Sequence, residues 1–201
     1  MRKFESLIQA VIFGFIPPIL GLLTGWWGAF AWLPERLIGP VALAGLTIGL
    51  LVDFFYLKKW VNQTETISWP VWLAIYLFYA VGMYGFFMGV PAFHLGLALP
   101  AGFIVGVKLT RQAAAVDHAQ RVSRLAGGLT TGVLACLCAA SAFLALSDPY
   151  TTANLEGMFA LNFEVTQPMI IGLIIGGGGI LLVANWWLTG VVSRWTLHHS
   201  S

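Results

Sequence analysis

The chain has 201 residues, of which 59% are hydrophobic and only 9% are charged. Soluble domains are about 25% charged, so this chain has too few polar side chains to cover a water-exposed surface, and a water-soluble globular domain is excluded. The net charge of +2 comes from dispersed basic residues, which excludes the clustered basic face of a nucleic-acid-binding protein.

Six apolar stretches are long enough to cross a membrane as helices, since a span needs about 20 apolar residues. The first exceeds the apolar part of a signal peptide, about 7–15 residues, so we expect a retained span. Pro91 separates the third stretch from the fourth, which predicts a tight helical hairpin. The sequence predicts an all-α, polytopic integral membrane protein, with residues 1–201 forming one transmembrane domain, a compact six-helix bundle. The expected spans cover approximately residues 7–32, 37–57, 69–90, 92–109, 125–146 and 168–192.

The basic residues gather on one side of the membrane if both termini lie in the cytoplasm. Of the 10 basic residues, only Arg36 then falls outside. Cytoplasmic loops are enriched in Lys and Arg, so we expect cytoplasmic N- and C-termini and a bacterial or archaeal cytoplasmic membrane. The polar segment Arg111–Arg124 is expected to form a separate short helix at the inner membrane surface. Its arginines could attract anionic lipid headgroups or dock a partner, although the orientation rule alone explains them.

Two spans contain residues that disfavour a continuous helix. Pro17 and Pro18 lack amide hydrogens, and the run Gly176-Gly177-Gly178-Gly179 has poor helix propensity. Interrupted helices in transporters expose backbone groups that bind substrates or ions, so we expect breaks or hinges at both places. The alternative is a simple kink and a tight packing seam.

Small residues four positions apart occur in every predicted span and allow helices to approach closely. With 23 glycines in the chain, some pairs arise by chance, so the pattern predicts a compact bundle and no specific dimer. The pairs are Gly21 and Gly25, Gly45 and Gly49, Gly85 and Gly89, Gly102 and Gly106, Gly128 and Gly132, and Gly172 and Gly176.

Asp53 is the one carboxylate within a predicted span, and it precedes Lys58 and Lys59 by about one and a half turns. It is therefore expected near the inner membrane interface and not at the midplane. Ionisable groups in lipid are costly and tend to face a bundle interior or a wet cavity. Asp53 is therefore a candidate for binding a cation or relaying a proton. The alternative is an ion pair with a lysine whose stem extends toward the interface.

The outer loop, residues 147–167, is acidic and carries no basic residue. Its interleaved apolar residues predict a short helix at the membrane interface or between the spans. Its carboxylates and amides could form an oxygen-rich mouth for a cation or a polar solute, whereas the alternative is a solvated acidic loop. The candidate binding residues are Asp148, Asn154, Glu156, Asn162 and Glu164.

The motifs of soluble enzymes are absent and no histidine pair has ligand spacing on one helix face. The sequence thus predicts no catalytic or metal-ligating residue and indicates no particular cofactor. We expect transport or binding of a small polar or cationic solute, by a homo-oligomer or beside a partner membrane subunit, among membrane lipids and without nucleic acid. The alternatives are a membrane enzyme acting on a lipid or quinone, with Asp53, His94 or the loop carboxylates as acid–base groups, and a structural subunit of a membrane complex.

Overall fold

The computed structural model describes residues 2–87, 89–112 and 115–199, and 89% of it is helical. The predicted all-α class and the six apolar spans are confirmed. The chain divides into two compact units, Met1–Ser68 and Trp69–Ser201, while the predicted single transmembrane domain stays a prediction. The helical segments long and apolar enough to cross a membrane are Glu5–Trp32, Glu35–Asn62, Trp69–Phe86, Pro91–Arg111, Val116–Ser147 and Gln167–His199.

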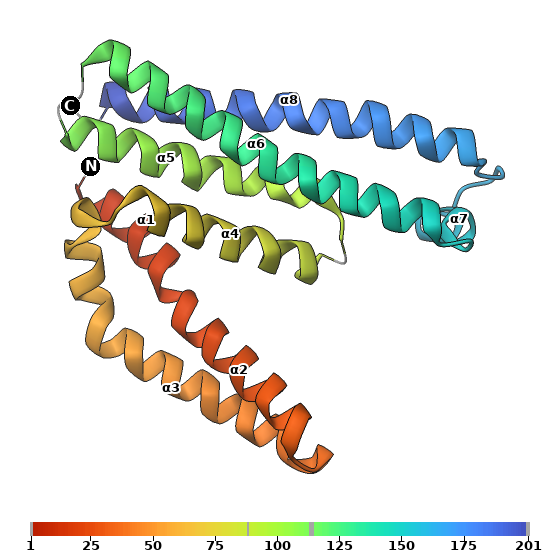
Figure 1. Ribbon diagram of the computed structural model, residues 1–201, viewed down its shortest axis with the longest axis horizontal. Coiled ribbons are helices and arrows are strands. Elements are labelled where there is room, and N and C mark those ends of the chain that lie inside the picture. The colour runs from red at the N-terminus through yellow and green to blue at the C-terminus, as the bar shows by residue number, and fades with distance from the viewer. Residues whose placement is uncertain (1, 88, 113–114, 200–201) are drawn as a thin grey trace. The chain divides into compact units, whose positions relative to one another are not determined.

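The first unit contains three long helices, and a proline pair interrupts its first membrane-length segment. The elements are α1 (Arg2–Gly14), α2 (Ile16–Trp32), α3 (Glu35–Asn62) and the 3-10 turn η1 (Thr64–Thr66) (Figure 1). Pro17 and Pro18 lie in the first turn of α2, where a missing amide hydrogen breaks no hydrogen bond within α2 itself. Phe15 is the residue between α1 and α2 and has a right-handed helical conformation, and the predicted hinge at this place stays a prediction.

Helices α2 and α3 run antiparallel and approach each other through glycines. An ideal Cβ on Gly21 would collide with the carbonyl oxygen of Gly45, and the reverse holds for a Cβ on Gly45. A Cβ on Gly25 would lie 2.7 Å from the carbonyl oxygen of Val41. Since no side-chain movement relieves such backbone overlaps, this crossing requires glycine. The predicted close approach is confirmed for these two helices.

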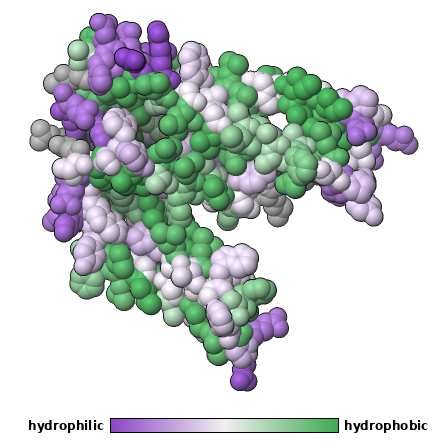
Figure 2. All heavy atoms as spheres, in the orientation of Figure 1, coloured by the Kyte–Doolittle hydropathy of each residue, from purple (hydrophilic) through white to green (hydrophobic). Residues whose placement is uncertain are grey.

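The second unit contains the remaining helices, of which α5, α6 and α8 pack against one another. Its elements are α4 (Trp69–Phe86), the 3-10 turn η2 (Pro91–His94), α5 (Leu95–Arg111), α6 (Val116–Ser147), α7 (Thr151–Phe159) and α8 (Gln167–His199). A small apolar cluster joins Val105 and Leu109 of α5 to Ala119 of α6. In each unit the hydrophobic residues cover the lengths of the helices and the hydrophilic ones gather near their ends, as Figure 2 shows.

The connection between α4 and α5 is short, which confirms the predicted hairpin. The helix α4 ends at Phe86, four residues before the predicted boundary, and Gly89 has a φ of +79°. This left-handed conformation suits glycine and turns the chain back. Pro91 then begins η2, which leads directly into α5.

The helix α6 differs from the sequence-based prediction at its start. The expected separate surface helix over Arg111–Arg124 is wrong, because α6 begins at Val116 and continues without interruption to Ser147. Ala119, Ser123 and Gly127 follow one another at four-residue intervals and are all buried. The buried face of α6 therefore begins within the polar segment, and the helix continues through that segment because its packing does.

The four-glycine run does not interrupt its helix. The helix α8 continues from Gln167 to His199 through Gly176–Gly179, so the expected break is absent, while a hinge there stays a prediction. A glycine costs about 1 kcal/mol in helix propensity, whereas each unsatisfied backbone group costs several kcal/mol in lipid. The packing-seam alternative finds no support at Gly176, Gly178 and Gly179, where an added Cβ would meet nothing within 4 Å among the described residues.

Candidate functional site

Asp53 lies within the membrane-length helix α3 and is buried, with 8% of its surface exposed. Its Oδ1 atom has no hydrogen-bond partner among the described residues. Lys58 and Lys59 are both exposed, and no ion pair with Asp53 occurs within the described part of the chain. The lysine ion pair that the sequence offered as an alternative is therefore not formed.

The packing of α3 places Asp53 beside the break between α1 and α2. Gly49, Asp53 and Leu57 are four residues apart and share one face of α3. An added Cβ on Gly49 would overlap the carbonyl of Pro17, and one on Gly14 would lie 3.6 Å from the side chain of Leu57. Because α3 runs antiparallel to both helices, Asp53 lies on the α3 face level with the segment between Gly14 and Pro17.

The break removes helical hydrogen bonds at this level. In an α-helix the carbonyl of residue i accepts from the amide of residue i+4. Pro18 has no amide hydrogen, so the carbonyl of Gly14 cannot receive this bond. The helix α1 also ends at Gly14, and a helix C-terminus carries partial negative charge. A carboxylate and a main-chain oxygen thus belong to the same region of the first unit, and such a region favours a cation.

The outer loop of the second unit contains the predicted short helix, α7, and uses two of its acidic residues for its own structure. The Glu156 carboxylate accepts a hydrogen bond from the amide of Val165 at 2.5 Å, which joins α7 to the segment before α8. The Asp148 carboxylate accepts from the amide of Tyr150 at 2.9 Å. Both bonds stabilise turns in the loop.

The remaining loop candidates are exposed: Asn154, Asn162 and Glu164. Within the described residues, no three His, Cys, Asp or Glu side chains are grouped so that they could hold a metal ion. The binding role of the loop residues stays a prediction, and Asp53 is the better supported candidate.

A polar face on α8 was not anticipated from the sequence. Asn185, Thr189 and Ser193 are each 0% exposed, and Thr196 is 1% exposed. Their spacing of four, four and three residues places them on one helix face, which is a signal that the sequence does contain. This polar face packs against Gly102 and Gly106 of α5 and against polar residues of α6.

Hydrogen bonds between α6 and α8 occupy most of this polar face. The Asn185 amide nitrogen donates to the hydroxyls of Thr130 and Thr131 at 3.2 Å each. The hydroxyls of Ser123 and Ser193 share a further hydrogen bond. Interhelical hydrogen bonds in membranes contribute about 0.6 kcal/mol each, so this cluster stabilises the packing of α6 on α8. The Oδ1 atom of Asn185 has no hydrogen-bond partner among the described residues.

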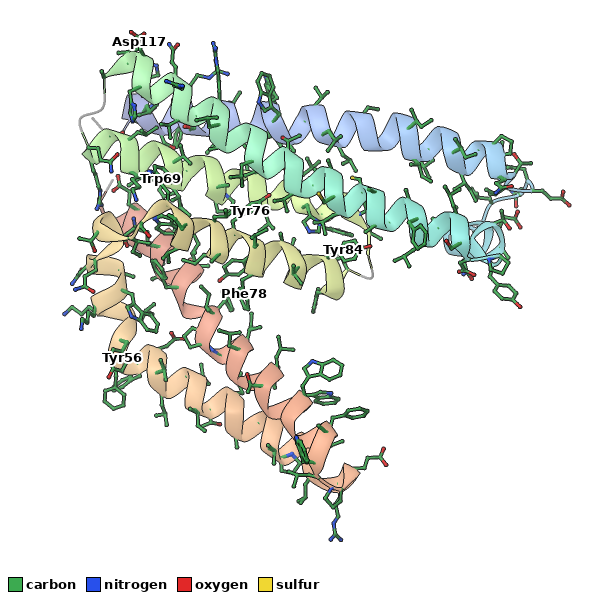
Figure 3. All side chains as sticks on the ribbon, viewed as in Figure 1. Tyr56, Trp69, Tyr76, Phe78, Tyr84 and Asp117 are labelled. Atoms are coloured by element: carbon green, nitrogen blue, oxygen red, sulfur yellow. The ribbon has the colours of Figure 1, made fainter. Side chains whose placement is uncertain are left out.

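His94, a candidate acid–base group, lies at the turn before α5 and is 1% exposed. Its Nε2 atom is 2.7 Å from the carbonyl oxygen of Ala80 on α4; because a carbonyl only accepts, Nε2 carries the proton. Close by, the Ser141 hydroxyl donates to the Gly89 carbonyl at 2.6 Å and lies 3.2 Å from the hydroxyl of Tyr84, which Figure 3 shows near the end of α4. The His94 bond joins the end of the hairpin to α4, and the Ser141 bonds join the hairpin to α6.

Comparisons with protein-family models, with curated proteins and with solved structures find no match for this chain. The residues themselves therefore carry the functional argument.

Proposed function

We propose that this chain is a multi-pass protein of a bacterial or archaeal cytoplasmic membrane that binds and translocates a small cationic or polar solute. The observation that carries the proposal is Asp53, a carboxylate in a membrane-length helix that is buried and whose Oδ1 has no hydrogen-bond partner among the described residues. Supporting it are the helix break beside Asp53 and the exclusion of Lys58 and Lys59 as ion-pair partners.

The physical argument is the cost of a charged group in lipid. A carboxylate costs about 2.5–3.5 kcal/mol at the centre of a membrane helix on insertion scales, and this value is an upper limit for Asp53, which lies five residues before Lys58 near the inner end of its predicted span. Helix packing does not require this cost, because the neighbouring contacts of α3 with α1 and α2 are made by Gly49 and Leu57. An acidic group retained in such a place suits the binding of a positive charge.

Replacing Asp53 with asparagine is expected to weaken ligand binding while leaving the fold intact. The substitution keeps the size of the side chain and removes its charge, so binding of a cationic solute should weaken at least about tenfold. The measurement is thermal stabilisation of the purified protein by a panel of primary amines, guanidinium compounds and polyols. Uptake of any stabilising compound into proteoliposomes then follows.

The matched control is Asp117→Asn, the same chemical change at an exposed residue near the start of α6 (Figure 3). This variant should behave as the natural sequence does. Equal stabilisation and uptake by the Asp53→Asn and Asp117→Asn proteins would remove Asp53 from the proposal.

The proposed orientation places both termini in the cytoplasm, because nine of the 10 basic residues then lie inside. Single cysteines introduced at Ser147 and Ser68, in a variant without Cys136 and Cys138, test this. A membrane-impermeant thiol reagent added to intact cells should label the cysteine at position 147 and spare the one at position 68. Labelling at position 68 alone would invert the orientation.

A second candidate is a subunit that assembles with other membrane helices, either copies of this chain or a different protein. It is favoured by glycines on α6 and α8 whose added Cβ would meet nothing within 4 Å among the described residues, including Gly128, Gly132 and Gly172. Such positions allow close helix packing. Failure of every compound in the panel to stabilise the protein would favour this candidate over the first.

A further inference from the structure

We infer that the ligand at Asp53 is a monatomic, monovalent cation, either an alkali-metal ion or a proton, held between the Asp53 carboxylate and the main-chain carbonyl of Gly14. The inference rests on the proposed function and narrows the chemical class of the ligand. It assigns this site to a coupling ion, so that an organic solute would bind elsewhere, and the weaker solute binding expected for Asp53→Asn would follow from loss of the coupled ion.

The size of the ligand follows from the packing on either side of Asp53. One turn before it, Gly49 lies so close to α2 that an added Cβ would be 2.6 Å from the Cα of Pro18 and would overlap Pro17. One turn after it, Leu57 is in ordinary van der Waals range of a Cβ on Gly14. With contacts at both levels, α3 cannot move away from α1 and α2 at Asp53 alone. Close contacts on both sides of Asp53 favour a single atom over an organic amine with its carbon substituents.

The charge of the ligand follows from the groups that surround the site. Helix α2 has no charged residue, and the lysines of α3 are exposed. The charged residues of α1 are confined to its first turn, three residues among positions 2–5, more than two turns before Gly14. With one carboxylate and a carbonyl dipole, a monovalent cation neutralises the site, whereas a divalent ion would leave a buried net charge that lipid disfavours.

The chemistry of the oxygens is consistent with both monovalent ions. Alkali ions in transporters bind to carboxylates and to carbonyls freed by broken helices. A proton on Asp53 would make the carboxyl a donor to an oxygen acceptor, and the carbonyl of Gly14 is suitable because Pro18 offers it no amide hydrogen. In both cases the proline pair is part of the site.

The test is thermal unfolding of the whole purified protein in detergent with four sequences: natural, Asp53→Asn, Pro17→Ala/Pro18→Ala and Asp117→Asn. Each is measured in sodium, potassium and choline chloride of equal concentration, at several pH values. We expect the unfolding temperature of the natural and Asp117→Asn proteins to rise by about 5 °C with the bound ion. An unfolding temperature that is higher in sodium or potassium chloride than in choline chloride identifies an alkali ion.

A proton is identified by an unfolding temperature that rises in all three salts as the pH falls. Protonation removes a buried negative charge, so this stabilisation is present at low pH and disappears as the pH rises through the titration of Asp53. Since other groups also titrate, the relevant quantity is the difference between the Asp117→Asn and Asp53→Asn proteins at each pH.

The Asp53→Asn protein should lose the response to the ion entirely. The proline variant keeps Asp53 but returns amide hydrogens to positions 17 and 18, so the Gly14 carbonyl regains its helical partner and the response should weaken. This variant tests the site even if Asp53→Asn does not fold. If the unfolding temperature of either variant responds to alkali ions and to protons as that of the natural protein does, the inference is overturned.

The outcomes separate this inference from the proposed function. Stabilisation by an organic amine that depends on Asp53, without any response to sodium, potassium or pH, would overturn the inference and leave the function standing. A response to an ion that depends on Asp53, without uptake of any solute, would overturn the function and leave the ion site.

Discussion

Replacing Gly21 with leucine is expected to separate α2 from α3 and to destabilise the first unit more than any other single substitution considered. The added Cβ would collide with the carbonyl oxygen of Gly45, and two backbones can only avoid such an overlap by moving apart. Overpacking a well-packed interior costs about 1–3 kcal/mol and occasionally more. The upper end is expected here, because association of helices in lipid depends on this close packing.

In thermal unfolding in detergent, Gly21→Leu should lower the unfolding temperature by about 10 °C or more. Gly28→Leu is the matched control, since Gly28 lies on the same helix and an added Cβ there meets nothing within 4 Å among the described residues. Both variants change helix propensity equally, so the difference between their unfolding temperatures measures the contribution of close packing between α2 and α3. Equal unfolding temperatures for Gly21→Leu and Gly28→Leu would contradict the crossing of α2 and α3.

The second large effect is expected at Gly106, where α5 packs on the polar face of α8. An added Cβ would lie 2.5 Å from the Cβ of Thr196 and 2.8 Å from the carbonyl oxygen of Ser193. Leucine at this position would push α5 away from α8 and expose polar side chains of α8 that are now covered. We expect Gly106→Leu to cost about 2–3 kcal/mol, measured as a shift of the unfolding midpoint in a denaturing detergent.

Gly176→Leu is the comparison for Gly106→Leu, and it tests the four-glycine run at the same time. An added Cβ at Gly176 meets nothing within 4 Å among the described residues, and leucine has the higher helix propensity by almost 1 kcal/mol. This variant should be as stable as the natural sequence or slightly more stable. A larger loss for Gly176→Leu than for Gly106→Leu would mean that the run is the packing surface after all.

The helices were predictable because they depend on local chemistry. Apolar stretches of sufficient length, Pro91 between the third and fourth spans, and the pair Pro17-Pro18 each act through the backbone of their own segment. The prediction was wrong at Arg111–Arg124, where polar residues suggested an interruption. Ala119 and Ser123 continue the buried face of α6, and that face exists only in contact with neighbouring helices.

The glycine pairs show what the sequence could not distinguish. Six pairs have identical spacing, yet only the pairs of α2, α3 and α5 bring backbones so close that a Cβ would not fit at either position. The pairs beginning at Gly128 and Gly172 face no neighbour within 4 Å in the described part of the chain. Spacing gives the shape of a helix face, whereas the choice of partner depends on every helix in the unit.

The candidate site also combines features that were visible in the sequence with features that only the structure showed. The sequence identified Asp53, because a carboxylate among apolar residues is visible without a structure. It could not show that Lys58 and Lys59 remain exposed, or that Gly49 and Leu57 place Asp53 level with the break at Gly14. In the outer loop, only the structure showed that Glu156 bonds to the amide of Val165.

The sequence by itself determined that this chain forms six apolar helices, where the first is interrupted, and which acidic residue lies within a span. These properties follow from hydrophobicity and from backbone hydrogen bonding, which act over a few turns of one helix. Only the tertiary structure decided which glycines are covered, which polar residues join α6 to α8, and which main-chain oxygen is level with Asp53. These depend on distances between segments far apart in the chain, because helices in lipid recognise one another by shape and hydrogen bonds and not by hydrophobicity.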